Sequence, residues 1–351
     1  MKKTVSLIIA ALCVMAVLVS CTLQTQQRYD ASFLELFDTV TQIVGYADSK
    51  EQFTEYSQNI YDELEEYDHL FDIYNSYEGI NNLKTINDNA GIEAVVVDQK
   101  IIDLLIFSKE MYQDTDGKVN VAMGSVLSLW HDYREAGLDD PEQAAIPDIQ
   151  ELTERAQHTN IDDIIIDEDA STVFLKDPEM SLDVGAIAKG YAVEEMADEI
   201  EEAGFERGMI SVGGNVRSIG LKYDDSGNEV PWSVGIQNPD LDSEEATLCI
   251  LGLQDLSLVT SGIYERYYVV DGKQYHHIID PDTLMPAAYF ASVSIVCEDS
   301  GLADALSTAV FNLPLEQGEA LIESFDGVEA LWVELDGTQH ESAGFSAYIK
   351  E

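Results

Sequence analysis

The spacing of apolar and polar residues divides the chain into helices and short strands. Apolar residues at helical spacing predict helices over 50–71, 101–112, 191–203, 302–311 and 315–325. Short apolar runs predict strands over 33–46, 95–97, 164–166, 173–175, 209–212, 233–236, 247–251, 257–259, 267–270, 292–296 and 330–335. The segment 130–147 mixes charged and turn-forming residues, which predicts a surface excursion. Many strands joined by tight turns, with few helices, are typical of an α+β fold with mostly antiparallel sheets.

The N-terminus carries the pattern of an export signal. Lys2 and Lys3 precede an apolar run that is too short to span a bilayer comfortably, and the run ends just before Cys21. A cysteine at the cleavage point predicts a lipoprotein signal peptide over 1–20, acylation of Cys21 and a lipidated tether over 21–30. We therefore expect the protein at the extracytoplasmic face of a bacterial membrane, held there by its lipid.

The rest of the chain has the composition of one acidic, folded unit. The full chain contains 67 acidic and 18 basic residues, for a net charge of −49, which argues against a nucleic-acid partner. No Pro- or Gly-rich linker divides it, so we expect one compact catalytic unit over 31–351, built from two intertwined lobes. Two cysteines of this unit, Cys249 and Cys297, could pair or could remain buried thiols.

The first candidate site is a turn between a strand-like and a helix-like segment, within residues 181–192. Asp183 and Lys189 flank the turn, and Gly185 and Gly190 allow the backbone to approach a phosphate or a metal closely. The spacing matches neither the Walker loop nor Gly-x-Gly-x-x-Gly. A purely structural bend remains the alternative.

A second candidate lies in the helix predicted over 302–311. Asp304, Ser307 and Thr308 fall on one face, and one carboxylate with hydroxyls suits Mg²⁺, which takes its other oxygens from water and phosphate. The alternative is a polar face whose hydroxyls bond back to the helix.

Adjacent histidines form a third candidate. His276 and His277 lie on a predicted strand and should point to opposite faces, so they cannot both bind one metal. One of them could act as a general base. A packed core histidine is the alternative reading.

Taken in order, these segments resemble the ApbE family, the FAD:protein FMN transferases. The resemblance rests on six segments spread over nearly the whole chain after the tether: Phe37-Asp38-Thr39, 183–192, 212–215, 260–267, 276–281 and 303–309. It implies a T-fold-like architecture and Mg²⁺-dependent transfer of FMN from FAD to a threonine of an acceptor protein, with release of AMP. The acceptors it implies are membrane redox subunits.

The resemblance also implies roles for individual residues. Mg²⁺ would be held by Asp304 and Thr308, with Ser307 nearby and the carbonyl of Ala186 completing the set. His277 would be the base for the incoming hydroxyl, and Asp304 would be the second catalytic residue. FAD would contact a further set of residues: Phe37, Tyr74, Ala122, Met123, Gly124, Asp183, Lys189 and the backbone at Ile278.

Two positions depart from the family pattern. Leu284 stands where relatives usually carry glycine, which puts the shape of that turn in doubt, and Ser125 stands where many have proline. Two other functions remain open from the sequence. Water could replace threonine, which would give an FAD pyrophosphatase, or the protein could bind flavin without catalysis.

Overall fold

The computed structural model describes residues 26–34 and 36–350. The predicted signal peptide and Cys21 lie outside the described residues. The first strand begins at Gln27, so the folded part starts inside the segment expected to be tether. Within the described ranges, no helix is both long and apolar enough to cross a bilayer.

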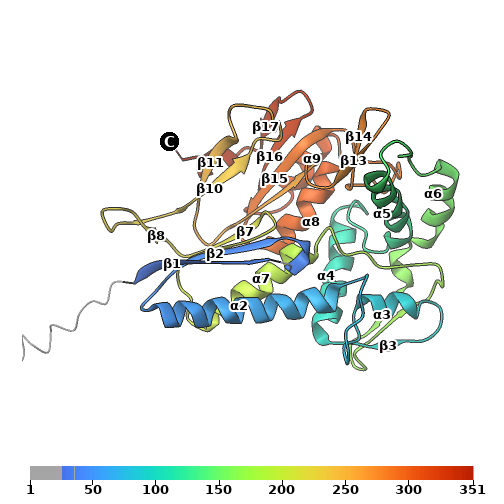
Figure 1. Ribbon diagram of the computed structural model, residues 1–351, viewed down its shortest axis with the longest axis horizontal. Helices are drawn as coiled ribbons and strands as arrows, with labels where there is room; N and C mark the ends of the chain where they lie inside the picture. The colour runs from blue at the N-terminus through green and yellow to red at the C-terminus, as the bar shows by residue number, and fades with distance from the viewer. Residues whose placement is uncertain (1–25, 35, 351) are drawn as a thin grey trace, which may run out of the picture.

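One antiparallel sheet of eight strands organises the molecule (Figure 1). Its strands, in spatial order, are β1 (Gln27–Leu34), β2 (Val40–Ala47), β6 (Gly208–Val212), β7 (Asn215–Ile219), β12 (Ser257–Gly262), β15 (Phe290–Cys297), β16 (Glu329–Glu334) and β17 (Gln339–Glu341). Every neighbouring pair is antiparallel. The predicted α+β class with mostly antiparallel sheets is confirmed.

Alternate residues of the central strands bury their side chains in two different cores. In β16, Ala330 and Trp332 pack with the helices α8 (Ser300–Phe311) and α9 (Leu315–Glu323), whereas Leu331 and Val333 pack with the hairpin of β10 (Trp232–Gln237) and β11 (Thr247–Leu253). This follows from the two-residue period of a strand. The sheet is thus covered on both faces at this end.

Two further helices cover the other end of the sheet. Helix α2 (Lys50–Phe71) lies along β1 and β2 in Figure 1, and α7 (Ala188–Glu202) packs beside it and against α8. The side chain of Ser49 accepts the amide of Gln52 and so fixes the start of α2. The periodicity of the sequence predicted the bounds of α2 correctly.

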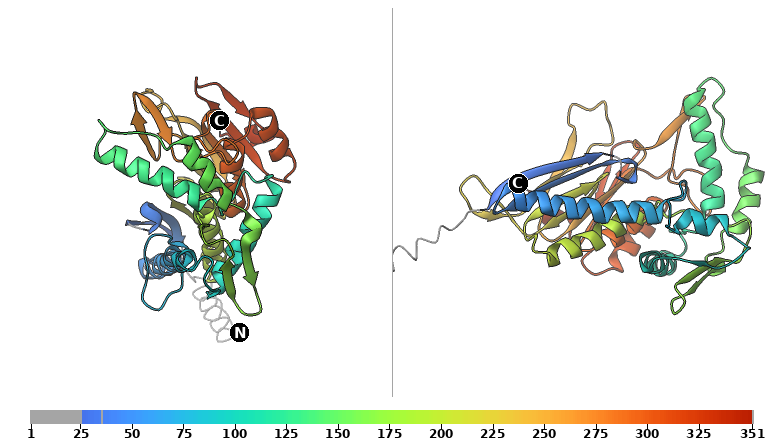
Figure 2. Two further views of the ribbon diagram at one scale, coloured as in Figure 1. Left: turned by 90° about the vertical axis from the view of Figure 1, so that its right-hand side faces the viewer. Right: turned by 60° about the horizontal axis from the view of Figure 1, so that its bottom comes forward.

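Most of the remaining elements form a group at one end of the molecule (Figure 2). They are the helices α3 (Leu83–Asp88), α4 (Gln99–Asp114), α5 (Gly124–Asp139) and α6 (Ile149–Arg155), the sheet β3 (Val95–Val96), β5 (Thr172–Leu175) and β4 (Ile164–Asp167), and the hairpin β13 (Tyr267–Val270) and β14 (Lys273–His276). A small hairpin, β8 (Lys222–Tyr223) and β9 (Glu229–Val230), and 3-10 turns at 36–38, 156–158, 161–163 and 345–348 complete the described elements.

Two predictions on the elements were wrong, and one question is settled. The surface excursion predicted from Trp130 is mostly the helix α5, whose Trp130 is buried against Tyr268. The single strand predicted over 33–46 is two strands, because Phe37 and Asp38 turn the chain with φ values of 51° and 53°. In the part of the chain that the structure describes, Cys249 and Cys297 are both free thiols and do not pair with each other.

Candidate active site

Two of the sequence motifs meet where the start of α7 crosses α8. Asp304 is only 5% exposed, and its Oδ2 accepts the backbone amide of Gly190 at 2.8 Å. A Cβ on Gly190 would lie 2.3 Å from the Ser300 carbonyl oxygen and 2.4 Å from the Asp304 Cβ. The helices can therefore touch only because residue 190 has no side chain.

Lys189 and Asn215 complete a polar cluster around Asp304. Lys189 Nζ donates to Asn215 Oδ1 at 3.1 Å, while Asn215 Nδ2 is buried without a hydrogen-bond partner among the described residues. Burial raises the pKa of Asp304, and the charge of Lys189 and the Gly190 amide offset part of that rise. Asn215 Nδ2 also lies close enough to lower this pKa, although its geometry falls short of a hydrogen bond. A buried donor with no acceptor is rare in a finished core, so this one is available to a ligand oxygen.

The oxygens near Asp304 fit a hard cation. Thr308 is half-buried and follows Asp304 by one turn of α8. The Gly190 amide donates to Asp304, and not to the carbonyl of Ala186 four residues earlier, so this amide leaves the Ala186 carbonyl oxygen unoccupied. Ser307 Oγ is fully buried, donates to the Asp304 carbonyl at 2.9 Å and contacts Ser261 Oγ at 2.8 Å. In the described part of the chain, no group of three or more His, Cys, Asp or Glu could hold a metal. A cation here would therefore need few carboxylates and several other oxygens, as Mg²⁺ does.

The adjacent histidines differ in their surroundings. His276 is buried, and both ring nitrogens are bonded, Nε2 to the Ala287 carbonyl and Nδ1 to the Ile278 amide. His277 reaches solvent, and its Nδ1 lies 3.2 Å from the Arg266 carbonyl. A carbonyl can only accept, so Nδ1 carries the proton and Nε2 keeps its lone pair. His276 is thus a core residue, and His277 is the one that can accept a proton.

The charge state of His277 is set by its neighbours. Although the residue is exposed at the surface, the protein packed around its ring removes hydration. This burial, together with the Arg266 charge, lowers the pKa of His277 to about 3. Lys189 also contributes to this lowering, so His277 lies within electrostatic range of the Asp304 cluster. The ring is neutral at neutral pH.

The segments predicted to contact FAD lie side by side. Met123 pairs with Ser181 in a parallel bridge, the Gly124 amide donates to the Ser181 carbonyl at 3.0 Å, and the Asp183 amide donates to the Val121 carbonyl at 2.9 Å. Asp183 Oδ1 accepts the Gly185 amide at 2.9 Å, and burial raises the pKa of Asp183. The turn that contains Ala122 is therefore fixed directly against the start of the 183–192 motif.

The two predicted aromatic contacts differ in their environment. Tyr74 is 56% exposed, and the charge of Asp183 adds to the effect of burial that raises the pKa of Tyr74 to about 12. Phe37 is half-buried in the strained turn between β1 and β2, where its amide donates to Asp68 Oδ1 at 2.8 Å. Tyr74 is thus near the Asp183 turn, whereas no contact within the described structure places Phe37 directly at this turn.

Sequence reasoning missed residues on α5 that face Tyr74. The rings of Tyr74 and His131 lie 5.3 Å apart at 31°, and His131 Nδ1 contacts Arg134 Nη2 at 2.9 Å. His131 and Arg266 both lower the pKa of Asp183, so they lie near it. The signal was present, because Val126, Leu129, Trp130, Tyr133 and Gly137 follow helical spacing, but the glycine at 124 suggested a turn.

Comparison with known proteins gives consistent matches. The model of the ApbE family matches residues 37–332. A protein of Treponema pallidum named FAD:protein FMN transferase is 36% identical over 272 residues, 75% of this chain and 73% of the relative. A protein of the same name from Klebsiella pneumoniae is 31% identical over 75% of this chain and 80% of its own.

Solved structures agree. The crystal structure of an ApbE protein from Thermotoga maritima has a TM-score of 0.79 at 30% identity, covering 93% of this chain and all of the other. The flavin transferase ApbE from Vibrio cholerae has a TM-score of 0.75 at 26% identity, over 92% of this chain and 99% of the other.

Proposed function

The chain belongs to the ApbE family, and on that basis we propose that it is an FAD:protein FMN transferase. The acceptor group is the hydroxyl of a threonine on another protein, and AMP is released. The observation that carries this proposal is the buried carboxylate of Asp304, held on the Gly190 amide beside Lys189 and the unpartnered Asn215 Nδ2.

The residues of the site have two kinds of role, the binding of charged groups and proton transfer. Asp304, Thr308 and the Ala186 carbonyl, with Ser307 nearby, would hold Mg²⁺, which neutralises the charge of a pyrophosphate and of the leaving AMP. Lys189 supplies a positive charge to the pyrophosphate, and Asn215 Nδ2 donates a hydrogen bond to a phosphate oxygen.

His277 supplies the base. The threonine oxygen attacks the phosphorus on the FMN side, the bond from that phosphorus to the bridging oxygen breaks, and AMP leaves with the bridging oxygen. The hydroxyl proton passes to Nε2 of His277, whose lone pair is left free by the bond at Nδ1. The negative charge of bound FAD would raise the pKa of His277 from its low value toward neutrality, which strengthens the base when substrate is present.

The direct test is an acceptor assay. The protein is incubated with FAD, Mg²⁺ and a threonine-bearing peptide, and a peptide with valine at that position serves as the control. We expect AMP and a flavinylated threonine peptide in equal amounts, and no product on the valine peptide. AMP without flavinylated peptide would instead establish a pyrophosphatase, and tight FAD binding without AMP would establish a flavin carrier.

Variants of the site separate its parts. Asp304→Ala should abolish Mg²⁺-dependent turnover while the protein stays folded. His277→Ala should slow transfer by about 10²–10⁴-fold with little change in FAD binding. His340→Ala, which removes a histidine paired with Glu334 on the last strands, is the control and should leave transfer unchanged. Equal loss of binding and transfer in His277→Ala would contradict the role of base.

The N-terminus supports a location for this reaction. We propose that Cys21 is acylated and that the lipid holds the enzyme beside membrane redox subunits that accept FMN. Expressed in a bacterium, the wild-type chain should enter the membrane fraction, and Cys21→Ala should not. Membrane association that survives Cys21→Ala would contradict the lipid anchor.

A further inference from the structure

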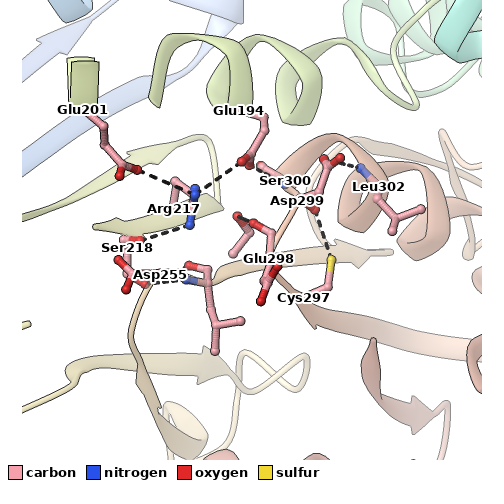
Figure 3. A network of polar contacts seen from close by, with 12 residues as sticks. Glu194, Glu201, Arg217, Ser218, Asp255, Cys297, Glu298, Asp299, Ser300 and Leu302 are labelled. Atoms are coloured by element: carbon pink, nitrogen blue, oxygen red, sulfur yellow. Dashed lines mark hydrogen bonds and ion pairs between the residues drawn. The ribbon is translucent and has the colours of Figure 1, made fainter. Parts of the chain in front are cut away.

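A buried ion pair lies behind the site, between α7 and the central sheet (Figure 3). Arg217 Nη2 on β7 lies 3.3 Å from Glu194 Oε1 on α7, and both side chains are largely buried. Arg217 Nη1 also donates to the Ser218 carbonyl at 3.2 Å, whereas its Nε is buried and has no hydrogen-bond partner in residues 26–34 and 36–350. A buried pair with an unsatisfied nitrogen is a poor source of net stability, because desolvation offsets the attraction. Its presence therefore suggests a different role.

The second oxygen of Glu194 reaches the helix that carries Asp304. Glu194 Oε2 accepts the amide of Ser300, the first residue of α8, at 2.7 Å. The side chain of the N-cap residue of α8, Asp299, accepts the Leu302 amide at 2.9 Å and not the Ser300 amide. Glu194 thus satisfies a helix-start amide that the cap residue does not, and its negative charge is favourable at that end of the helix.

The same two helices are joined at the site by the bond from the Gly190 amide to Asp304 Oδ2. Gly190 and Glu194 are one turn apart on α7, and their partners Asp304 and Ser300 are one turn apart on α8, in the opposite direction. Helix α7 therefore holds α8 at two points. One of them is the carboxylate proposed to bind the cation.

We propose that Glu194 is a positioning residue for Asp304. Arg217 holds the Glu194 carboxylate, the carboxylate fixes the first turn of α8, and α8 then presents Asp304 to the Gly190 amide and the Lys189 side of the site. The contact is structural, and only its consequence for Mg²⁺ rests on the proposed function. Burial raises the pKa of Glu194 to about 7, while Arg217 and the Ser300 amide act to keep the carboxylate charged.

The chain offers a matched control in Glu201. This residue lies on the same helix and its Oε1 approaches the same Arg217 Nη2, at 3.7 Å. No contact joins Glu201 to α8 in the described structure. Glu194→Ala and Glu201→Ala therefore both weaken the pairing of Arg217, but only Glu194→Ala removes the contact to Ser300.

The first measurement needs no activity. Amide hydrogen exchange is followed in the full chain without FAD or Mg²⁺, at the first turn of α8 and at Gly190. Glu194→Ala should accelerate exchange at both places, and Glu201→Ala at neither. Unchanged exchange at Gly190 in Glu194→Ala would overturn the proposal, whatever the activity. If Glu194→Ala does not fold, Glu194→Gln keeps the volume and should show the same change to a smaller degree.

The second measurement separates positioning from general damage. In the acceptor assay, Glu194→Ala should raise the Mg²⁺ concentration for half-maximal rate by about 10–100-fold, as for other residues that orient metal ligands. The KM for FAD should change less than about twofold, since no FAD contact is altered, and Glu201→Ala should match the wild type. Equal changes in Mg²⁺ requirement and KM would overturn the positioning role. If the wild type shows no Mg²⁺-dependent transfer, the proposed function is refuted. The contact between Glu194 and α8 is still tested by the hydrogen-exchange data, which do not depend on activity.

Discussion

At the scale of single residues, the turn after the two histidines shows how the chain tolerates an unfavourable residue. Leu284 has a φ of 59°, the left-handed conformation that glycine adopts without cost. Its amide donates to the Asp280 carbonyl at 2.8 Å, and its carbonyl accepts Trp130 Nε1 at 3.0 Å. The turn therefore keeps the glycine-like conformation because its backbone is bonded at both ends.

A pair of substitutions at this position measures the strain. Both Leu284→Ala and Leu284→Gly should lose the packing of the leucine side chain. Only Leu284→Gly should also remove the free-energy cost of the left-handed conformation, which alanine keeps. We expect Gly to be more stable than Ala by about 1 kcal/mol, from urea unfolding. Equal stability of the two variants would show that the left-handed conformation costs nothing here.

His277 shows how one neighbour tunes a proton acceptor. Arg266→Gln should raise the pKa of His277, because a positive charge is removed while the carbonyl that orients the ring stays. Burial, the larger cause, should still hold the pKa below 6.5. The pKa can be followed by NMR titration of the imidazole, with Arg155→Gln on α6 as a control that should leave it unchanged. An unchanged pKa in Arg266→Gln would contradict the electrostatic role of Arg266.

The low pKa of His277 also sets the direction of a stability change with pH. The unfolded histidine takes up its proton near pH 6.5, whereas the folded one does so only near pH 3. The unfolded state thus binds more protons in this window, so the stability contributed by the neutral ring is present above pH 6.5 and is lost as the pH falls toward 3. In Arg266→Gln this loss should be smaller, because the two pKa values lie closer together.

At the scale of elements, the contact between α7 and α8 depends on a missing side chain. Gly190→Ala places a methyl group against the Ser300 carbonyl and the Asp304 Cβ, and should destabilise the protein by about 1–3 kcal/mol. Gly318 on α9 is the matched helical glycine, since its nearest neighbours would lie at 3.4 Å. Gly318→Ala should be neutral or stabilising, by up to about 1 kcal/mol. The free energy of unfolding of both variants is measured in urea. An equal change for Gly190→Ala and Gly318→Ala would contradict the close approach of α7 and α8 at Gly190.

Local patterns were sufficient for most elements but not for their arrangement. The helix over 50–71 and the strands over 164–166 and 173–175, which form β4 and β5, were predicted because their periodicity is encoded within a few residues. Helix α5 was missed because Gly124 looks like a turn in isolation. Its glycine is needed for another reason, since a Cβ there would lie 2.5 Å from the Ser181 carbonyl oxygen. The residue that requires a glycine at position 124, Ser181, lies far away in the sequence, so this requirement leaves no local signal.

The same limit applies to the site. Asp304, Lys189 and His277 were singled out by residue type and by resemblance, and the structure places them in one neighbourhood. Asn215 lies in the segment 212–215 of the resemblance but was given no role, and His131 was not singled out, because the importance of both comes from what they face. Asn215 Nδ2 matters because it is buried without a partner, and His131 because it lies against Tyr74. Neither property can be read from spacing along the chain.

At the scale of the whole molecule, the net charge of −49 should oppose folding. The screening length falls from about 30 Å at 0.01 M salt to about 8 Å at 0.15 M, so NaCl weakens the repulsion between distant acids before it affects buried pairs such as Glu194 and Arg217. The urea midpoint should therefore rise from 10 to about 150 mM NaCl. Sucrose at matched osmolality is the control for solvent effects, and should produce a smaller rise. A midpoint that falls with added NaCl would mean that surface ion pairs, and not the excess of acids, dominate the electrostatic energy of this fold.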